Sequence, residues 1–270
     1  MNQVWKRVMA VGLTACLSLS ILAMPAQAAQ TGQAPALTQD HVQYMQGFPE
    51  GTFQPDTQLT RAQAAQMVCR LLADPNSGSG GCSYQDVPAN QWYAQAVTAL
   101  CRLGLFDDGA AFRPNDIITR AEFVDLLVRL RPEAQGEASF PDVPAGHWAA
   151  KQIGAAVALG WINGYPDGTF GPGKLITRAE AVTIVNRTLD RHPDQDHFLK
   201  DMLVWVDNMD TSKWYYEDMQ EATNSHEYEM KGSGDNKYEN WTKMLPIRDW
   251  AAFEKEWSDA NSASGGEVVK

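Results

Sequence analysis

The sequence predicts an all-α domain in which three helix–turn–helix units, joined by short extended turns, pack into a ring. Two observations support this prediction. One short motif recurs three times at a nearly constant interval, and apolar residues at helical spacing follow each copy. Units of this size cannot bury their apolar faces alone, so we expect the three to pack against one another.

A secretory signal is predicted at residues 1–28. Two basic residues precede an apolar run over residues 8–24, and an Ala-Gln-Ala triplet follows, which predicts cleavage after Ala28. A lipoprotein signal with Cys16 as the lipidated residue is the alternative. We therefore expect a secreted protein. No later stretch reaches the roughly 18 apolar residues that a membrane span requires, so we expect no membrane span.

The composition excludes a general attraction to polyanions. The chain carries 22 Lys and Arg against 33 Asp and Glu, a net charge of −11. Loss of the two basic residues of the signal changes this to −13. We therefore expect no nucleic-acid partner, and any anionic ligand must be bound by local geometry against the overall field.

The recurring motif is Thr-Arg-Ala, which begins at Thr60, Thr119 and Thr177. A proline precedes each copy by five residues, and a Gly-Tyr-Pro-Asp-Gly-Thr-Phe type of turn, altered in the second copy, precedes the proline. In the second and third copies, an Asp-Val-Pro segment and a tryptophan lie further upstream. This half is missing from the first copy and is found instead at residues 205–216. We therefore expect the last half-repeat to complete the first unit and close the ring.

The repeats define the predicted boundaries. The repeat domain is expected over residues 29–228, and the tail over residues 229–270 has no predicted structure. The units are predicted at about residues 37–73, 82–131 and 138–190, with a closing half-unit at 198–228. The tail is too short for an enzyme domain, and its aromatic residues are expected to pack on the repeats or to contact another protein. These residues are Trp241, Trp250, Phe253 and Trp257.

Two helices are predicted in each unit. In the helix that follows the motif, Thr is the N-cap and the residue three positions later is Gln63, Glu122 or Glu180, which predicts a capping box. The other helix is predicted to begin two residues before a tryptophan and to end at Gly104 or Gly160. The expected N-caps of this second kind of helix are Asn90, Gly146 and Ser212.

Three cysteines follow the predicted signal, and an oxidising exterior favours one disulfide among them. Cys69–Cys82 and Cys82–Cys101 are the two candidate pairs. Either pairing leaves one thiol over.

The combined pattern F-x-D-V, W, G-Y-x-D-G-T-F-x-P and I-T-R-A-E resembles the S-layer homology motif, and the third copy, at residues 140–180, matches it nearly throughout. The resemblance covers about residues 37–228. It implies a three-pronged helical spindle that binds secondary cell-wall polymers, often pyruvylated, in grooves between repeats.

The function implied by the resemblance is non-covalent anchoring to the bacterial cell wall, with localisation in the wall or S-layer. The expected partner is a secondary cell-wall polymer or a glycan linked to peptidoglycan, and other surface proteins are further candidates. The alternative is a self-assembling S-layer or surface structural protein that acts through protein–protein contacts.

Three arginines are the leading ligand-binding candidates: Arg61, Arg120 and Arg178. Each occupies the first helical position, where a cation opposes the helix macrodipole, so its recurrence requires a reason. Beside the free N–H groups of a helix N-terminus, an arginine forms a receptor for a carboxylate or phosphate. The alternative is that each arginine pairs with an aspartate and ties repeats together. Arg178 is the strongest candidate because the third copy is the least altered.

The other candidates recur in the same repeats. Asp86, Asp142 and Asp207 are the possible arginine partners, and they are equally suited to hydrogen-bonding sugar hydroxyls or capping the following helix. Trp92, Trp148 and Trp214 are expected in the core more than against sugar rings. Gly51 and Gly168 are expected to be turn glycines that also let a sugar approach.

The sequence contains no recognisable catalytic or cofactor-binding motif, so we expect no enzyme activity and no cofactor. His192 and His197, with the two aspartates between them, are a weak candidate for a metal site. Their position in a polar linker favours solvated side chains, and no metal site is predicted.

Overall fold

The computed structural model describes residues 34–107, 109–250 and 252, all of which belong to one compact unit, Ala34–Lys270. The predicted signal at residues 1–28, Phe253 and Trp257 lie outside the described residues.

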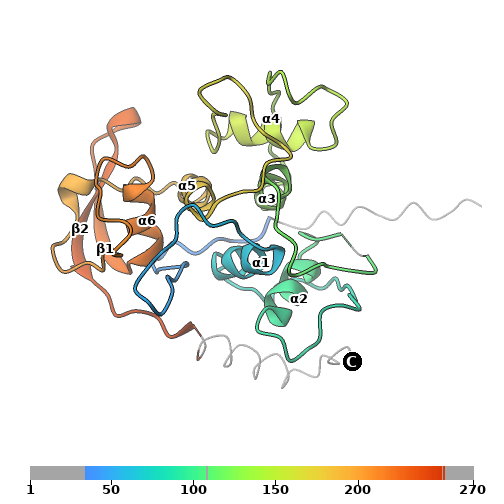
Figure 1. Ribbon diagram of the computed structural model, residues 1–270, viewed down its shortest axis with the longest axis horizontal. Helices are drawn as coiled ribbons and strands as arrows, with labels where there is room; N and C mark the ends of the chain where they lie inside the picture. The colour runs from blue at the N-terminus through green and yellow to red at the C-terminus, as the bar shows by residue number, and fades with distance from the viewer. Residues whose placement is uncertain (1–33, 108, 251, 253–270) are drawn as a thin grey trace, which may run out of the picture. The chain divides into compact units, whose positions relative to one another are not determined.

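Six α-helices in the described residues pack as three successive pairs, α1 with α2, α3 with α4, and α5 with α6 (Figure 1). The first helix of each pair begins at a Thr-Arg-Ala motif. The second is the next helix along the chain and begins just after a tryptophan. The bounds are α1 Arg61–Arg70, α2 Ala94–Arg102, α3 Arg120–Val128, α4 Ala150–Ala158, α5 Arg178–Thr188 and α6 Tyr216–Thr223.

The predicted capping boxes are confirmed in all three copies. The side chains of Thr60, Thr119 and Thr177 accept a hydrogen bond from the backbone N–H three residues later, and the Gln or Glu at that position accepts one from the threonine N–H. Two otherwise unpaired amides are thereby satisfied at the start of each helix, which explains why α1, α3 and α5 begin where they do.

The predicted N-caps of the other helices are wrong by three residues. These helices begin after Tyr93, Ala149 and Tyr215, and none of them has a side-chain cap. Asn90, Gly146 and Ser212 lie instead in successive backbone turns that carry the tryptophans. The predicted ends at Gly104 and Gly160 are confirmed, since both glycines have a positive φ and a backbone bond closes the last turn behind each.

A closed ring of backbone hydrogen bonds lies where the three units meet. The N–H of Leu59 donates to the carbonyl of Ile176, Ile176 donates to Ile118, and Ile118 donates back to Leu59, at 3.0–3.2 Å. All three side chains are buried. Because each link joins a different pair of units, the units are bonded cyclically as well as along the chain.

The prediction of an all-α fold is wrong in one part. Strands β1 (His226–Lys231) and β2 (Tyr238–Met244) form an antiparallel hairpin beside α6 (Figure 1). Two 3₁₀ turns, η1 (Gln195–His197) and η2 (Gly234–Asn236), complete the described elements. The hairpin escaped prediction because its buried positions include His226 and Glu239 in place of apolar residues, while the other five residues of β1 are exposed.

The tail packs on the repeats through its aromatic residues. Trp241 is buried against His226, and the indole N–H of Trp250 donates to the carbonyl of Gln43 at 3.0 Å. Packing on the repeats is therefore observed for Trp241 and Trp250. Every helix in the described part of the chain is too short or too polar to span a lipid bilayer.

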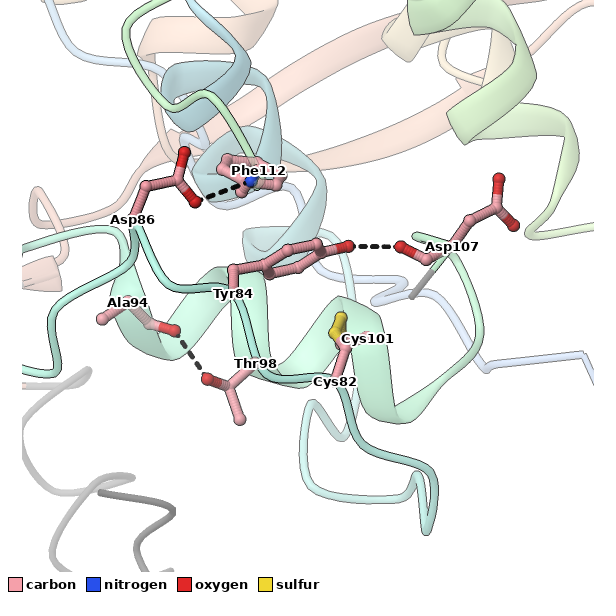
Figure 2. Close-up of a disulfide and its surroundings, with 8 residues drawn as sticks. All are labelled: Cys82, Tyr84, Asp86, Ala94, Thr98, Cys101, Asp107 and Phe112. Atoms are coloured by element: carbon pink, nitrogen blue, oxygen red, sulfur yellow. Dashed lines mark hydrogen bonds between the residues drawn. A yellow bond between two sulfur atoms is a disulfide. The ribbon is translucent and has the colours of Figure 1, made fainter. Parts of the chain in front are cut away.

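The disulfide joins Cys82 to Cys101, so of the two candidate pairs Cys69–Cys82 is wrong (Figure 2). Cys69 lies buried in α1 and takes no part in this bond. The disulfide ties the segment that enters the second unit to the last turn of α2. A loop of 19 residues closed in this way stabilises the fold by about 3 kcal/mol.

Candidate ligand site at the junctions between repeats

Each motif arginine turns away from its own helix and reaches into the next unit of the ring. The Nε of Arg61 donates to the carbonyl of Phe112, and the Nε of Arg178 donates to the carbonyl of Phe53, both at 2.8 Å. The guanidinium of Arg120 lies over the ring of Phe170, 5.0 Å from its centre. Contacts of this kind explain why a cation is tolerated at a helix N-terminus.

The expectation of free N–H groups beside these arginines is wrong. The amides of Arg61, Arg120 and Arg178 donate at 2.8–2.9 Å to carbonyls in the turn of the next unit. The amides one residue later donate, at 3.0–3.2 Å, to the carbonyls of the prolines that lie five residues before each motif. These prolines are Pro114, Pro172 and Pro55. The helix N-termini therefore bind neighbouring turns, and only the guanidinium groups are left to bind an anion.

The repeat aspartates neither pair with the arginines nor cap a helix. Each carboxylate accepts two backbone N–H groups from the turn that precedes a motif helix, at 2.7–2.9 Å, as Figure 2 shows in part for Asp86. The second amide of each pair belongs to a residue with positive φ, so the carboxylate stabilises a left-handed backbone conformation. The pairs are Asp86 with Phe112 and Arg113, Asp142 with Phe170 and Gly171, and Asp207 with Phe53 and Gln54.

Asp207 also joins the two ends of the repeat region. It lies in the last half-repeat, yet the amides that it binds lie in the first unit, 153 and 154 residues earlier. Asp207 thus accepts a pair of turn amides equivalent to the pairs that Asp86 and Asp142 accept from turns much closer in the sequence. The amide of Val206 adds a bond to the carbonyl of Gly51 at 3.2 Å.

The charge partners of the arginines differ between junctions. Arg61 lies 3.1 Å from Glu122, and Arg120 lies 3.6 Å from Glu180; each glutamate is the capping-box residue of the next unit. At the third junction the equivalent capping-box residue is Gln63, which carries no charge. In the part of the chain that the structure describes, no carboxylate lies within ion-pair distance of Arg178.

Arg178 is therefore a buried cation whose direct contacts are neutral, and the Asp207 carboxylate acts on it only from beyond ion-pair distance. Its residue is 5% exposed, its Nη2 donates to the carbonyl of Gln46 at 2.7 Å, and its guanidinium lies over the rings of Phe48 and Phe53. Burial lowers the pKa of Arg178 to about 10. The group stays charged at neutral pH, so an anion at this junction would gain a strong electrostatic contact.

The three tryptophans are exposed, and the prediction that they lie in the core is wrong. Trp92, Trp148 and Trp214 are 58%, 59% and 63% exposed. The residue that follows each tryptophan is buried instead of the tryptophan. These residues are Tyr93, Ala149 and Tyr215. The indole rings are therefore available for contacts outside the fold, and flat sugar faces are one surface that such rings fit.

Gly51 and Gly168 are turn glycines. Their φ angles are 82° and 81°, a conformation that side chains with a Cβ rarely adopt. A Cβ on either would meet no atom within 4 Å, so the backbone there is open to an approaching molecule.

His192 and His197 contact different aspartates. His192 lies 3.1 Å from Asp190, and His197 lies 3.3 Å from a different aspartate, Asp194. The structure instead brings together four buried residues that the sequence analysis missed: His41, Glu221, His226 and Glu239. They lie up to about 200 positions apart in the sequence, so no local spacing could have indicated them.

Comparison with known proteins matches the three repeats to one family. The family model for the S-layer homology domain matches residues 43–65, 83–124 and 139–182. Among curated proteins of Acetivibrio thermocellus, the chain is 36% identical to a cellulosome-anchoring protein over 210 residues, which is 73% of this chain and 45% of that protein.

Two further relatives from the same organism are much longer than the matched part. Cell surface glycoprotein 1 is 32% identical over 228 residues, 78% of this chain and 9% of its own length. Exoglucanase XynX is 33% identical over 156 residues, 54% of this chain and 14% of its own length. The chain thus spans less than half the length of each of these relatives. Through its three matched repeats, this chain belongs to the S-layer homology family.

Proposed function

We propose that this chain anchors itself non-covalently to the bacterial cell wall by binding an anionic secondary cell-wall polymer at the junctions between repeats. A pyruvylated polymer is the chemistry that fits, because a ketal carboxylate supplies the ion-pair partner that Arg178 lacks and that Arg61 and Arg120 have. The wall-binding unit comprises residues 29–228 together with the hairpin. It acts outside the cell after export by the signal over residues 1–28.

Arg178 carries this proposal. A buried guanidinium without a carboxylate is costly, and a ligand carboxylate offsets that cost by forming charge-assisted hydrogen bonds worth about 1.5–3 kcal/mol each. Arg61 and Arg120 already have carboxylate partners inside the fold, so their junctions offer less to an anion. The third junction is therefore the principal binding site in this proposal.

The remaining candidates have supporting roles. Trp92, Trp148 and Trp214 stack on sugar rings of the polymer, and the open backbone at Gly51 and Gly168 lets those rings approach. The repeat aspartates shape the turns through the backbone amides that they accept, and the remaining lone pairs of each carboxylate can still accept sugar hydroxyls.

The relatives support a surface role without catalysis for the matched region. One is named for anchoring and another for the cell surface, and each aligns with more than two thirds of this chain. The exoglucanase aligns over only 14% of its own length, which supports placing its catalysis outside the shared region.

The decisive variant is Gln63→Glu, which supplies the carboxylate that the other two junctions already have. We expect Arg178 to pair with it, so that affinity for purified cell walls carrying pyruvylated polymer falls about tenfold, equivalent to ~1.4 kcal/mol. The melting temperature should rise by about 2–4 °C, because a new charged hydrogen bond contributes about 1 kcal/mol. Co-sedimentation with the walls and circular dichroism measure the two effects.

Glu122→Gln is the matched control, since it makes the opposite change at the first junction and leaves Arg61 without its carboxylate. It should lower the melting temperature without weakening retention on walls. Walls stripped of their secondary polymer should retain neither protein. Equal binding of wild type and Gln63→Glu, or equal binding to stripped walls, would contradict the proposal. Concentration-dependent assembly without wall material would then favour the self-assembling surface protein.

A further inference from the structure

Four buried side chains from four separate segments converge where the hairpin meets the repeats. His41 comes from the N-terminal segment, Glu221 from α6, His226 from β1 and Glu239 from β2. One potential ligand atom from each lies within 4.8 Å of the others. The shortest separations of His41 Nδ1 are 3.0 Å to Glu221, 3.2 Å to His226 Nε2 and 3.3 Å to Glu239.

The atoms that face one another are mostly lone-pair donors. Glu221 Oε2 and Glu239 Oε2 are buried and have no hydrogen-bond partner in the described chain. His226 Nδ1 lies 3.1 Å from the carbonyl oxygen of Asn224, which can only accept, so Nδ1 carries the ring proton and Nε2 presents its lone pair. A proton on His41 Nδ1 would satisfy one of these acceptors, whereas a single cation would satisfy all of them.

The spacing fits a tetrahedral divalent ion. Ligands about 2.0–2.2 Å from a zinc ion lie about 3.4 Å from one another. The four closest imidazole–carboxylate separations in the cluster are 3.0, 3.3, 3.3 and 3.8 Å. Two imidazoles with two carboxylates form a donor set suited to zinc and neighbouring transition metals, whereas calcium and magnesium prefer oxygen ligands alone.

Surrounding groups hold the four side chains in place. Arg191 lies 3.0 Å from Glu221 Oε1, the same oxygen that lies 3.0 Å from His41 Nδ1, and Glu221 Oε2 lies 3.3 Å from His226 Nε2. The amide of His192 donates to Glu239 Oε1 at 2.7 Å, which leaves Glu239 Oε2 directed into the cluster. The His226 ring stacks on Trp241, with ring centres 3.7 Å apart. Oriented ligands of this kind are typical of metal sites in proteins.

We propose that His41, Glu221, His226 and Glu239 bind one divalent transition-metal ion of the zinc type. Four protein ligands complete the tetrahedral coordination and leave no open position, so the ion is structural rather than catalytic. It fastens the hairpin and α6 to the segment before Gln46, whose carbonyl accepts a hydrogen bond from Arg178. Metal binding by this cluster does not require a wall ligand, so it is tested without one.

The test uses the purified chain, treated with a chelator, dialysed and titrated with Co²⁺. Saturable binding of one equivalent, with the visible absorption of tetrahedral cobalt and displacement by Zn²⁺, is the expected result. Free Zn²⁺ at a hundredfold excess over its dissociation constant should raise the melting temperature by about 5–10 °C. Absence of a saturable tetrahedral signal in the folded wild-type chain would overturn the proposal and leave a proton-bridged cluster of histidines and glutamates.

Variants locate the ion within the chain. Glu239→Gln and His41→Gln should each weaken Co²⁺ binding at least tenfold, while His192→Gln and His197→Gln should bind it as the wild type does. Both control histidines are partly exposed and lie near the hairpin, so they test binding by surface imidazoles. A cobalt signal that persists in both cluster variants, or that disappears in the controls, would contradict the assignment of the ligands.

Discussion

Three aspartates that recur in the repeats show how a single residue determines the path of the backbone. Asp86, Asp142 and Asp207 each receive two amides from a turn whose second residue has positive φ. In the third repeat that residue is glycine, whereas Gln54 and Arg113 occupy it in the other two. A non-glycine residue is disfavoured in this conformation, and the carboxylate offsets that cost.

Asp142→Asn should lower the melting temperature by about 2–4 °C at pH 7, since it weakens two charged hydrogen bonds that solvent partly screens. Burial raises the pKa of Asp142, but the amides of Phe170 and Gly171 lower it more, so the net shift is downward. The stabilisation is therefore present above the ordinary carboxyl pKa of about 4 and is lost as the pH falls through the lower value in the fold.

Thermal unfolding followed by circular dichroism between pH 7 and pH 2 measures this effect. The difference between variant and wild type should shrink as the pH falls, and the exposed control Asp201→Asn should show no difference at any pH. A constant difference across the range would exclude the charged hydrogen bonds as its source.

At the scale of elements, helices of the two kinds are stabilised in different ways. Helices α1, α3 and α5 have capping boxes and donate their first amides to a neighbouring turn. Helices α2, α4 and α6 have no side-chain cap and are held by packing against their partners. In the second unit, the disulfide between Cys82 and Cys101 supplies a covalent tie to α2.

Replacing Cys82 and Cys101 together by alanine should lower the melting temperature by about 6–12 °C, because the loss of this cross-link removes about 3 kcal/mol. Reduction of the wild-type chain should have a similar effect and should leave the double variant unchanged. Differential scanning calorimetry gives the comparison. An unchanged melting temperature in the variant would mean that packing alone holds α2 in place.

At the scale of the whole molecule, the ring closes through contacts between distant parts of the chain. The hydrogen bonds among Leu59, Ile118 and Ile176 join all three units, and Asp207 joins the last half-repeat to the first unit. Because every unit contacts both of the others, loss of one junction should weaken the whole ring. We therefore expect the repeats to unfold together.

Asp207→Asn should lower the melting temperature as much as Asp142→Asn does, although its partners lie more than 150 residues away in the sequence. Urea unfolding followed by tryptophan fluorescence and by circular dichroism should give coincident single transitions for both variants. Separate transitions, or an Asp207→Asn variant as stable as the wild type, would show that the ends of the repeat region contribute little to the ring.

Local patterns in the sequence were sufficient to predict the parts of the molecule that depend on local interactions. The threefold Thr-Arg-Ala motif, the capping boxes and the helix ends at Gly104 and Gly160 all follow from residues close to one another in the chain. The exposure of the tryptophans did not follow, because an aromatic residue after a turn packs inward or outward according to which neighbour fills the core. Here Tyr93 and Tyr215 fill it.

By itself the sequence determined the family, the number of repeats and the arginines that mark each junction. Only the tertiary structure decided that Arg178 lacks the carboxylate that Arg61 and Arg120 have, because that partner belongs to the next unit of the ring. It also decided that His41, Glu221, His226 and Glu239 meet in one buried cluster. The physical reason is the same in both cases: the chemistry of a buried charge depends on groups that folding brings from distant segments, and no local spacing records them.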